Sequence, residues 1–342
     1  MLKMMFGYQA RKAKNKVHQL LGASVFICAA LTVSTVHAGD YTDRKDVAAF
    51  IDEMVQEHQF TKAELELWMA AATKKQSILD AISRPAEKRL TWKEYRKIFV
   101  TSSRIKKGVK FWEENQDVLT KAEQEFGVPA SVIVAIIGVE TRYGQNKGRY
   151  RVVDALSTLG FDYPPRAKFF RKELKQFFLL AREQKQDPLA LLGSYAGAMG
   201  YGQFIPSSYR AYAIDYTNDE FADIWNNPTD AIGSVANYFK RHGWKTDQPV
   251  VVRARAKGEY NRELLNDSLK PKHTVASLAP EGYTPVPSLE EQTANMIRLK
   301  GQYGTEFWMG LHNFYVITRY NHSRLYAMAV WQLSQEIAKA KS

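Results

Sequence analysis

A run of apolar residues, Val132–Val139, ends in a single carboxylate, Glu140. Pro129 precedes the run and suits the first turn of a helix, because its ring presets φ and its missing N–H is not needed there. Gly144 follows and suits a helix end. A helix that is apolar on every side must be buried. The run therefore predicts a short buried helix that pushes Glu140 outward at its C-terminal end.

Glu140 has the surroundings expected of a general acid. Apolar walls and the negative end of the helix dipole both disfavour the charged carboxylate, so we expect its pKa to be raised. A carboxyl group that keeps its proton near neutral pH can protonate a glycosidic oxygen. The alternative is a surface carboxylate paired with Arg142 or another cation, and the local pattern leaves both interpretations open.

Residues 1–38 have the pattern of a secretory signal peptide. Five basic residues come first, and an apolar stretch follows from about Leu20 to Val33. Val36-His37-Ala38 provides small residues at the cleavage positions, so the mature chain would begin at Gly39 and lie in the periplasm. An uncleaved membrane anchor is the alternative, although the apolar stretch is short for a bilayer span.

Cys28 is the one cysteine of the chain and lies in this N-terminal segment. Membrane association would require lipidation at Cys28, but Phe26 and Ile27 precede it where a small residue is expected. We therefore expect a periplasmic protein without a lipid anchor, and an outer-membrane lipoprotein is the alternative. A mature chain without cysteine cannot form disulfides, so its stability must come from a packed core.

The composition agrees with a packed, exported protein. The chain has 342 residues, of which 45% are hydrophobic, enough for a sizeable core and two or three lobes. Removing the five basic residues of the N-terminal segment from the net charge of +12 leaves +7. A basic exported protein can bind anionic lipid or anionic cell wall. Export argues against nucleic acid, and we expect a monomer.

The periodicity of the mature chain predicts helices with one β region. Thr61–Glu64 and Thr91–Glu94 both fit the capping box of a helix start. A long amphipathic helix is predicted over Ser103–Phe126, and alternating apolar and basic residues after Gln248 predict strands. The expected units are a signal peptide (1–38), an N-terminal helical region (39–107), a core (108–246), a small antiparallel β insertion (247–313) and a C-terminal return to helix (314–342).

The segment Gly193–Pro206 contains four glycines, which is too many for a packing helix. Glycines let the backbone approach a ligand or another backbone closely. Tyr201, Gln203 and Phe204 lie among them and suit a sugar platform, where a ring stacks on the pyranose face and an amide bonds hydroxyls. The alternative is a close-packed structural loop.

The segment Asp215–Phe221 places oxygen ligands at alternate positions, as at the start of a calcium loop, with Asp230 as a later ligand. Glu220 stands where an EF-hand loop needs glycine for its turn. A solvated acidic turn is therefore the alternative. His322 has no cysteine or second histidine at ligand spacing, so we expect it to cap or hydrogen-bond rather than bind a metal.

Several enzyme classes can be excluded from the residues. The chain has no Gly-x-Ser-x-Gly elbow, no His-Glu-x-x-His and no Gly-Lys-Ser/Thr phosphate loop. A two-carboxylate glycosidase needs a second Asp or Glu across the bond. Neither Ala196–Pro206 nor Tyr320–Tyr326 supplies one. This absence favours a mechanism in which the substrate supplies its own nucleophile.

Four segments, in this order, resemble the membrane-bound lytic murein transglycosylase B family: Gly138–Gly144, Ala196–Phe204, Asp230–Tyr238 and Tyr320–Asn321. The resemblance covers essentially the whole mature chain. It implies a mainly α (α+β) fold, with a lysozyme-like helical core, an N-terminal helical domain and a small inserted antiparallel β domain. It also implies cleavage of the β-1,4 bond between N-acetylmuramic acid and N-acetylglucosamine without water, which leaves a 1,6-anhydromuramyl end.

The resemblance assigns roles to individual residues. Glu140 is implied to protonate the bridging oxygen and then to accept the proton of the muramyl C6 hydroxyl as that oxygen attacks C1, with the N-acetyl group assisting. Arg166 matches a position expected to meet peptide-stem carboxylates, beside Pro165 where a second arginine is expected. The other positions that match the sugar site are Tyr95, Ser194, Met199, Gln203, Phe204, Tyr320, Asn321 and Tyr326.

The family also has an EF-hand-like calcium site, and the implied chemistry requires no cofactor. Two departures bear on a structural Ca²⁺ here: Glu220 replaces glycine, and the loop is longer by about one residue. The implied partners are peptidoglycan glycan strands and other cell-wall enzymes. A lysozyme-type hydrolase and a non-catalytic peptidoglycan-binding protein are the alternative functions. The implied calcium ligands are Asp215, Thr217, Asp219, Phe221 (backbone) and Asp230.

Overall fold

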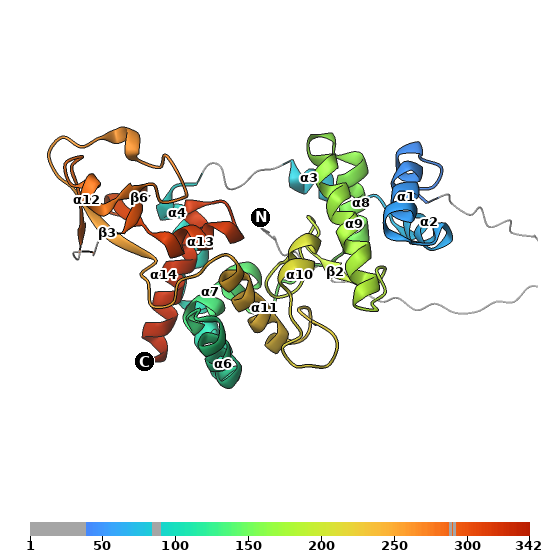
Figure 1. The fold of residues 1–342 in the computed structure, drawn as a ribbon, viewed down its shortest axis with the longest axis horizontal. Helices are drawn as coiled ribbons and strands as arrows, with labels where there is room; N and C mark the ends of the chain where they lie inside the picture. The colour runs from blue at the N-terminus through green and yellow to red at the C-terminus, as the bar shows by residue number, and fades with distance from the viewer. Residues whose placement is uncertain (1–38, 84–89, 287–288, 290–291) are drawn as a thin grey trace, which may run out of the picture.

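The computed structural model describes residues 39–83, 90–286, 289 and 292–342 (Figure 1). The predicted signal peptide, with Cys28, lies outside the described residues. The fold is elongated, with α1 and α2 at one end and a β domain at the other (Figure 1). The mainly helical α+β class predicted from the sequence is confirmed. The limits of the five units stay predictions.

Helices account for most of the described chain, and their bounds are as follows. They are α1 Lys45–His58, α2 Lys62–Ala71, α3 Gln76–Ile82, α4 Trp92–Phe99, α5 Ser102–Glu114, α6 Gln116–Phe126, α7 Ala130–Thr141, α8 Val152–Asp162, α9 Ala167–Glu183, α10 Pro206–Tyr212, α11 Pro228–Arg241, α12 Val275–Leu278, α13 His312–Tyr320 and α14 Arg324–Lys341. Among the described residues, the 3-10 turn η2 Pro164–Arg166 joins α8 to α9, and the 3-10 turn η3 Arg262–Leu264 lies in the β domain.

The strands form two antiparallel sheets. One is a pair of β1 Tyr150–Arg151 and β2 Leu192–Gly193. The other has five strands in the order β4-β6-β7-β3-β5, with β6 and β7 joined by a tight hairpin between Gly301 and Gly304. The strands of this β domain are β3 Val251–Ala256, β4 His273–Thr274, β5 Tyr283–Val286, β6 Thr293–Gly301 and β7 Gly304–Gly310.

The apolar run forms α7, and every residue of α7 is buried. The helix packs against α5, α6, α11 and α14, so it is enclosed on all sides as its composition requires. Glu140 lies inside the last turn with 6% of its surface exposed, so it is buried rather than pushed outward. Gly127 ends α6 with a φ of 70°, and the chain then turns into α7.

No single helix in the part of the chain that the structure describes is long and apolar enough to cross a membrane. Only α6 and α7 taken together pass by length and composition, and they are bent by 114°.

Two long helices predicted from the sequence are broken. Asn115 separates α5 from α6, and its side-chain amide donates to the carbonyl of Phe111 at 2.8 Å. The predicted C-terminal helix is divided into α13 and α14, and Ser323 caps α14 by accepting from the N–H of Tyr326. The helical periodicity of apolar residues continues through both breaks, because the helices before and after each break bury their apolar faces in the same hydrophobic cluster.

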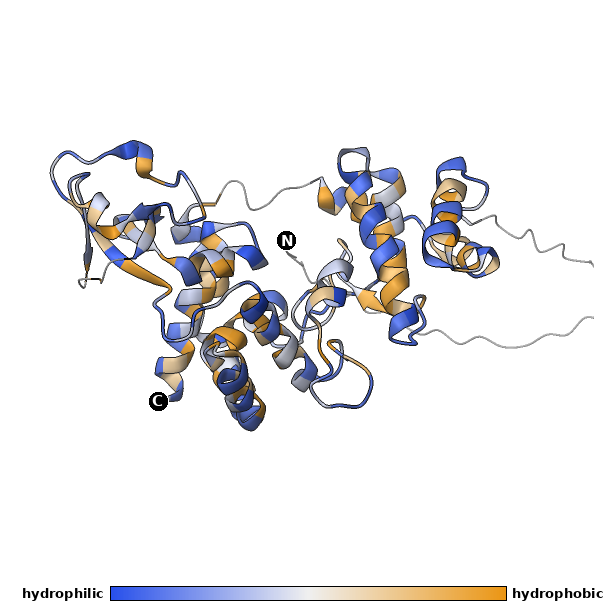
Figure 2. Cartoon of the chain, in the orientation of Figure 1, coloured by the Kyte–Doolittle hydropathy of each residue, from blue (hydrophilic) through white to orange (hydrophobic). Residues whose placement is uncertain are grey.

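The helices before residue 107 belong to two different hydrophobic clusters. Residues of α1–α3 pack with α8 and α9, and Arg44 forms an ion pair with Asp162 at 3.1 Å. Residues of α4 and α5 pack instead with α7, α14 and the β domain. Hydrophobic (orange) and hydrophilic (blue) residues alternate along α9 (Figure 2). The hydrophobic face of α9 packs in the cluster that contains α1–α3 and α8. The two clusters meet near the cleft described below.

A glycine inside α7 permits close packing behind Glu140. A Cβ on Gly138 would lie 2.5 Å from the hydroxyl oxygen of Tyr143, and a Cβ on Gly108 of α5 would lie 2.6 Å from the same atom. Tyr143 donates from this hydroxyl to the carbonyl of Arg104 at 2.8 Å. The Tyr143 ring therefore fits between α5 and α7 because Gly108 and Gly138 have no side chains.

We expect Gly138→Ala to destabilise the protein by about 1–2 kcal/mol, because overpacking costs about 1–3 kcal/mol and the helix-propensity gain returns only about 1 kcal/mol. Calorimetric melting measures the change. Gly160→Ala in α8 is the matched control, because its nearest neighbour is the flexible Arg171 side chain at 3.1 Å. Equal melting temperatures for both variants would contradict this packing account.

Candidate active site

A cleft of about 340 Å³ lies where the two hydrophobic clusters meet, and Glu140 lines it. The cleft receives side chains from α7, α9, α11, α13, the loop after β2 and the start of α10. A larger hollow of about 690 Å³ lies between α1 and α2, away from Glu140. The residues lining the cleft are Ile82, Glu140, Arg166, Phe169, Phe170, Ser194, Tyr195, Ala196, Ala198, Gln203, Phe204, Ile205, Ser208, Tyr238, Arg319 and Tyr320.

Glu140 accepts a short hydrogen bond from the phenol of Tyr326, with 2.6 Å between the oxygens. Tyr326 lies in the first turn of α14 and is 1% exposed. Burial, and then the negative charge of Glu140, raises the pKa of Tyr326 well above its ordinary value. The phenol therefore keeps its proton at any physiological pH and acts as a fixed donor to the carboxylate.

Tyr320 forms a second fixed point beside Glu140. Its phenol donates to the carbonyl of Gly202 at 2.5 Å, and a Cβ on Gly202 would lie 2.8 Å from that phenol oxygen. The ring stacks on Phe239 with centroids 5.7 Å apart, and it lies 6.5 Å from the parallel ring of Tyr326. Burial, followed by the charge of Glu140, raises the pKa of Tyr320 well above its ordinary value. The break between α13 and α14 thus places both tyrosines at Glu140.

The glycine-rich loop, residues 193–206, is close-packed and also lines the cleft. Met199 and Phe204 exchange two backbone hydrogen bonds, of 2.8 and 3.0 Å. Gln203 takes a φ of 53° between them, and its amide donates to the carbonyls of Lys147 and Gly200 at 3.2 and 3.0 Å. Gln203 and Phe204 line the cleft, whereas Met199 is fully buried. The loop is close-packed and also presents side chains to the cleft.

Tyr201 was predicted to contact sugar together with Gln203 and Phe204, but it does not line the cleft. Its ring packs 6.3 Å from Phe111. A Cβ on Gly144, which has a φ of 85°, would lie 2.2 Å from this ring. Thr141 donates to the carbonyl of Tyr201 at 3.0 Å and accepts from the N–H of Gly144 at 3.0 Å. Tyr201 therefore joins the glycine loop to the end of α7.

The other predicted site residues fall into two groups. Ser194 and Arg166 line the cleft; Ser194 accepts from the N–H of Ala198 at 3.1 Å, and Arg166 lies 4.3 Å from the ring centroid of Phe169. Tyr95 and Asn321 are not among the lining residues. Tyr95 is 2% exposed with its ring 4.8 Å from Phe99, and Asn321 is the C-cap of α13.

Sequence reasoning missed five residues that line the cleft with rings or charge. They are Phe169, Phe170, Tyr195, Tyr238 and Arg319. Tyr238 ends the Asp230–Tyr238 segment that carried part of the resemblance, so a signal was present. Phe169 and Phe170 fit the pattern of the apolar face of α9. The local sequence does not show whether an apolar residue on that face lines a cleft or packs in the core.

Glu140 is the one carboxylate among the described residues that line the cleft. Glu173 of α9 is buried nearby, but it accepts from the N–H and the hydroxyl of Ser207, both at 2.9 Å. Burial raises the pKa of Glu173, and these two hydrogen bonds oppose the rise. Glu173 therefore caps the start of α10 and is not placed to direct a water across a bound sugar.

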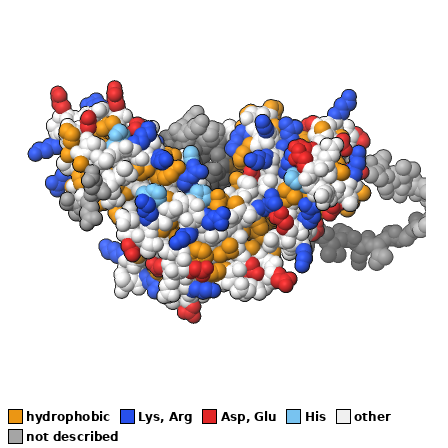
Figure 3. Space-filling model, viewed as in Figure 1, with side chains coloured by type: hydrophobic (Ala, Val, Ile, Leu, Met, Phe, Trp, Pro, Cys, Tyr) orange, Lys and Arg blue, Asp and Glu red, His pale blue; other side chains and the backbone are white. Residues whose placement is uncertain are grey.

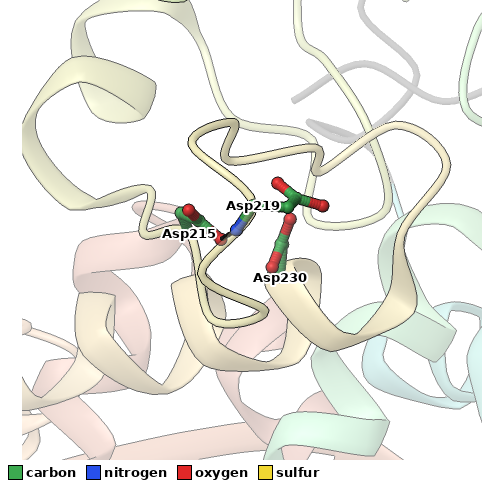
Figure 4. A group of neighbouring side chains, drawn as sticks. All are labelled: Asp215, Asp219 and Asp230. Atoms are coloured by element: carbon green, nitrogen blue, oxygen red, sulfur yellow. Dashed lines mark hydrogen bonds between the residues drawn. The ribbon is translucent and has the colours of Figure 1, made fainter.

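The segment Asp215–Phe221, called the acidic loop below, brings the carboxylates of Asp215 and Asp219 close to that of Asp230 (Figure 4). Oxygen atoms of Asp215, Asp219 and Asp230 all lie within 4.8 Å of one another. Thr217 donates to Asp215 at 3.3 Å and to Asp230 at 3.0 Å, so its hydroxyl belongs to the same cluster. Asp230 also accepts from the backbone N–H groups of Tyr216 and Thr217, which ties the loop to α11.

Glu220 adopts the backbone conformation that a glycine would normally provide. Its φ is 73°, and its N–H donates to Asp215 at 2.7 Å. The loop therefore makes this turn with a non-glycine residue in the left-handed region, which carries a steric cost. Phe221 donates its N–H to Asp219 at 3.1 Å. The oxygen donors present are of the kind that Ca²⁺ prefers.

His322 has the hydrogen-bonding surroundings expected from the sequence. Its Nε2 lies 3.5 Å from a guanidinium nitrogen of Arg319. No described cluster of metal-ligating side chains includes it.

The sequence profile described as "Transglycosylase SLT domain" matches residues 42–335 of this chain. Membrane-bound lytic murein transglycosylase B of Escherichia coli K12 is 45% identical over 313 residues, which cover 89% of this chain and 85% of that protein.

Solved structures of similar proteins share the fold over most of their length. The catenated lytic transglycosylase SltB1 from Pseudomonas aeruginosa is 54% identical, with a TM-score of 0.86, and covers 89% of this chain and 100% of its own. Escherichia coli Slt35 in complex with calcium is 45% identical, with a TM-score of 0.81 and coverages of 89% and 96%. SltB3 from Pseudomonas aeruginosa in complex with NAG-anhNAM-pentapeptide is 27% identical, with a TM-score of 0.77 and coverages of 85% and 78%.

We expect Tyr326→Phe to raise the pH at which Glu140 loses its proton, because the hydrogen bond from the Tyr326 phenol favours the ionised carboxylate. NMR titration of the Glu140 carboxyl carbon measures the shift. Tyr303→Phe, at a hairpin tip where Tyr303 is 97% exposed, is the control. An unchanged titration in Tyr326→Phe would show that the phenol does not stabilise the carboxylate.

Proposed function

The chain belongs to the transglycosylase SLT domain family, and we propose that Glu140 is its acid and base in the non-hydrolytic cleavage of peptidoglycan. The substrate bond is the β-1,4 link between N-acetylmuramic acid and N-acetylglucosamine. The observation that supports this most is that Glu140 is the single carboxylate among the described residues lining the cleft, and that it accepts a hydrogen bond from the buried Tyr326 phenol. One group that gives and then takes a proton needs no second acid.

In the first step, protonated Glu140 gives its proton to the bridging oxygen as the bond from that oxygen to muramyl C1 breaks. The N-acetyl group of the muramyl residue assists at C1 as an internal nucleophile. The N-acetylglucosamine side leaves as an alcohol, and Glu140 is left as a carboxylate. The Tyr326 phenol, 2.6 Å away, stabilises this ionised state without taking part in proton transfer.

In the second step, Glu140 accepts the proton of the muramyl C6 hydroxyl while that oxygen forms a bond to C1 and the bond between C1 and the N-acetyl oxygen breaks. The product is a 1,6-anhydromuramyl end, and Glu140 is protonated again for the next cycle. A hydrolase would need a second carboxylate to direct water at C1. Glu173 of α9 does not line the cleft, and its carboxylate accepts two hydrogen bonds from Ser207.

The rings and cations of the cleft suit a glycan strand with peptide stems. Half-buried rings line the cleft, among them Phe169 and Tyr195, and a pyranose can pack against them. Arg166 and Arg319 lie on the cleft wall and can pair with carboxylates of the peptide. The peptidoglycan fragment in the SltB3 structure supports the same class of ligand.

We place this activity in the cell envelope, as the name of the Escherichia coli relative suggests, and propose the periplasm as the compartment. The signal-peptide pattern of residues 1–38 supports export. Other cell-wall enzymes are the proposed protein partners, and we propose that the chain acts as a monomer.

We further propose that the acidic loop binds a structural Ca²⁺. Asp215, Thr217, Asp219, Asp230 and the carbonyl of Phe221 are the ligands we assign. The ion would offset the repulsion of three carboxylates within 4.8 Å and stiffen the loop before α11. It would take no part in bond cleavage. The calcium complex of Escherichia coli Slt35 supports this proposal.

We expect Glu140→Gln to lower the rate of anhydromuropeptide release by about 10²–10⁴-fold, since that is the usual contribution of a general acid–base. Mass spectrometry of digested sacculi measures the products. Glutamine keeps the size of the side chain, so binding to sacculi in a pull-down should persist. Glu173→Gln is the matched control, because it removes a buried carboxylate that caps α10, and it should keep the product pattern.

Two results would overturn this proposal. Reducing muramyl ends from the wild type would identify a hydrolase. Equal background release by the wild type and Glu140→Gln would identify a binding protein without catalysis.

We expect Ca²⁺ to raise the melting temperature of the wild-type protein. In Asp219→Asn we expect Ca²⁺ to raise the melting temperature much less. A ligand present at 100 times its dissociation constant adds about 2.7 kcal/mol of stability. Differential scanning calorimetry in calcium and in chelator measures both effects, and Asp247→Asn, outside the loop, is the control. A rise of the same size in Asp219→Asn would remove Asp219 from the ligand set.

A further prediction concerns the turn at Glu220. We expect Glu220→Gly to stabilise the protein by about 1 kcal/mol, because glycine occupies the left-handed region without steric cost. It should also tighten calcium binding, because a relaxed loop closes more easily on the ion. Isothermal titration measures the affinity, and weaker binding in this variant would contradict the strain account.

A further inference from the structure

A small pocket separate from the cleft gathers three cations at the start of α5. It has a volume of about 40 Å³ and is lined by Thr101, Ser103, Arg104, Lys107, Arg142 and Tyr143. None of these residues lines the catalytic cleft. No ion pair among the described residues includes Arg104, Lys107 or Arg142. The pocket is therefore positively charged, and the described residues give these three cations no counter-charge.

Arg104 is the buried member of this set, with 6% of its surface exposed. One guanidinium nitrogen donates to the carbonyl of Ile98 at 2.5 Å, and the group lies 5.1 Å from the ring centroid of Phe99. Its Nε is buried and has no hydrogen-bond partner among the described residues. Burial, and then the charge of Arg142, lowers the pKa of Arg104 to about 10. The guanidinium therefore stays charged although it has lost most of its hydration.

The backbone adds further positive potential. Thr101 is the N-cap of α5, a helix of 13 residues, and its hydroxyl accepts from the N–H of Arg104 at 3.2 Å. The first N–H groups of a helix and its dipole together favour an anion at this end. Lys107 follows on the next turn, and its ammonium donates to the side-chain carbonyl of Gln145 at 2.7 Å. The helix start and the three cations thus face one small space.

We propose that this pocket binds a small oxyanion, with Arg104 as its buried anchor and Lys107 and Arg142 at its mouth. Its volume admits one head group and excludes a sugar ring. Two or three positive charges around one head group favour a dianion of the phosphate or sulfate type over a single carboxylate. Phosphate can come from solution or from a phosphorylated envelope component, and the chemistry of recognition is the same for both.

The pocket is connected to the catalytic helix through the backbone. Arg142 and Tyr143 follow Thr141 directly and take φ values of 53° and 61°, both in the left-handed region. An anion held by Arg104 of α5 and Arg142 would join α5 to the end of α7. It would stabilise this turn two residues after Glu140. Figure 3 shows that blue basic side chains occur on many parts of the surface, so charge alone does not identify the pocket; the buried Arg104 does.

The test measures melting of the full mature chain in inorganic phosphate, in sulfate and in acetate, with chloride used to match ionic strength and with a calcium chelator present. We expect a saturable rise in melting temperature with phosphate and sulfate and a smaller one with acetate. Glycerol phosphate is added as a further arm: a rise equal to that of inorganic phosphate indicates room for an esterified head group. A rise with inorganic phosphate alone restricts the ligand to the free ion. No anion-specific change in the wild type would overturn the proposal.

Three variants locate the effect. Lys107→Ala should weaken the apparent phosphate affinity at least about 10-fold, as the loss of one charge-assisted hydrogen bond predicts. Lys106→Ala, exposed on the same helix and outside the pocket, should leave it unchanged. Arg104→Met should abolish the response and melt no lower than the wild type in chloride, because a buried unpaired charge is replaced by an apolar side chain of similar length. A wild-type response in Arg104→Met would overturn the proposal. If that variant does not fold, an unchanged affinity in Lys107→Ala would overturn it.

Discussion

The hydrogen bond between Glu140 and Tyr326 joins two segments that are 186 residues apart in the chain. It exists only because α7 and α14 are packed against each other inside one hydrophobic cluster. The carboxylate is buried, so its ionised state needs a strong partner, and a phenol that keeps its proton supplies one without a compensating charge. The arrangement of the surrounding helices, loops and glycines serves to bring these two side chains together.

Two breaks in helices make this arrangement possible. The chain turns between α13 and α14, which places the rings of Tyr320 and Tyr326 nearly parallel, with 6.5 Å between their centroids. The break at Asn115 lets α6 turn back toward α11 while α5 continues against α14. The glycine loop is then attached to the end of α7 through Thr141 and Tyr201. The cleft is thus bounded by turns whose positions are fixed by side-chain hydrogen bonds.

Local features of the sequence predicted local features of the fold. The apolar run after Pro129 predicted α7, and the capping box at Thr91 is present in full, with Thr91 and Glu94 bonding each other's backbone N–H. The sequence made Glu140 a candidate because a single carboxylate ends an apolar run. The burial of Glu140, the contact with Tyr326 and the place of Tyr201 depend on pairings between distant segments, and periodicity carries no information about those. For the same reason, the association of α1–α3 with α8 and α9 could not be predicted.

The central claim is that the cleft uses one carboxylate and no water at the anomeric carbon. The most direct measurement digests purified sacculi with the full-length mature enzyme in water enriched in the heavy oxygen isotope, followed by mass spectrometry of the released muropeptides. Our account predicts unlabelled 1,6-anhydromuramyl ends, because the oxygen bound to C1 comes from C6 of the same sugar. Heavy oxygen at C1 of reducing muramyl ends would contradict it.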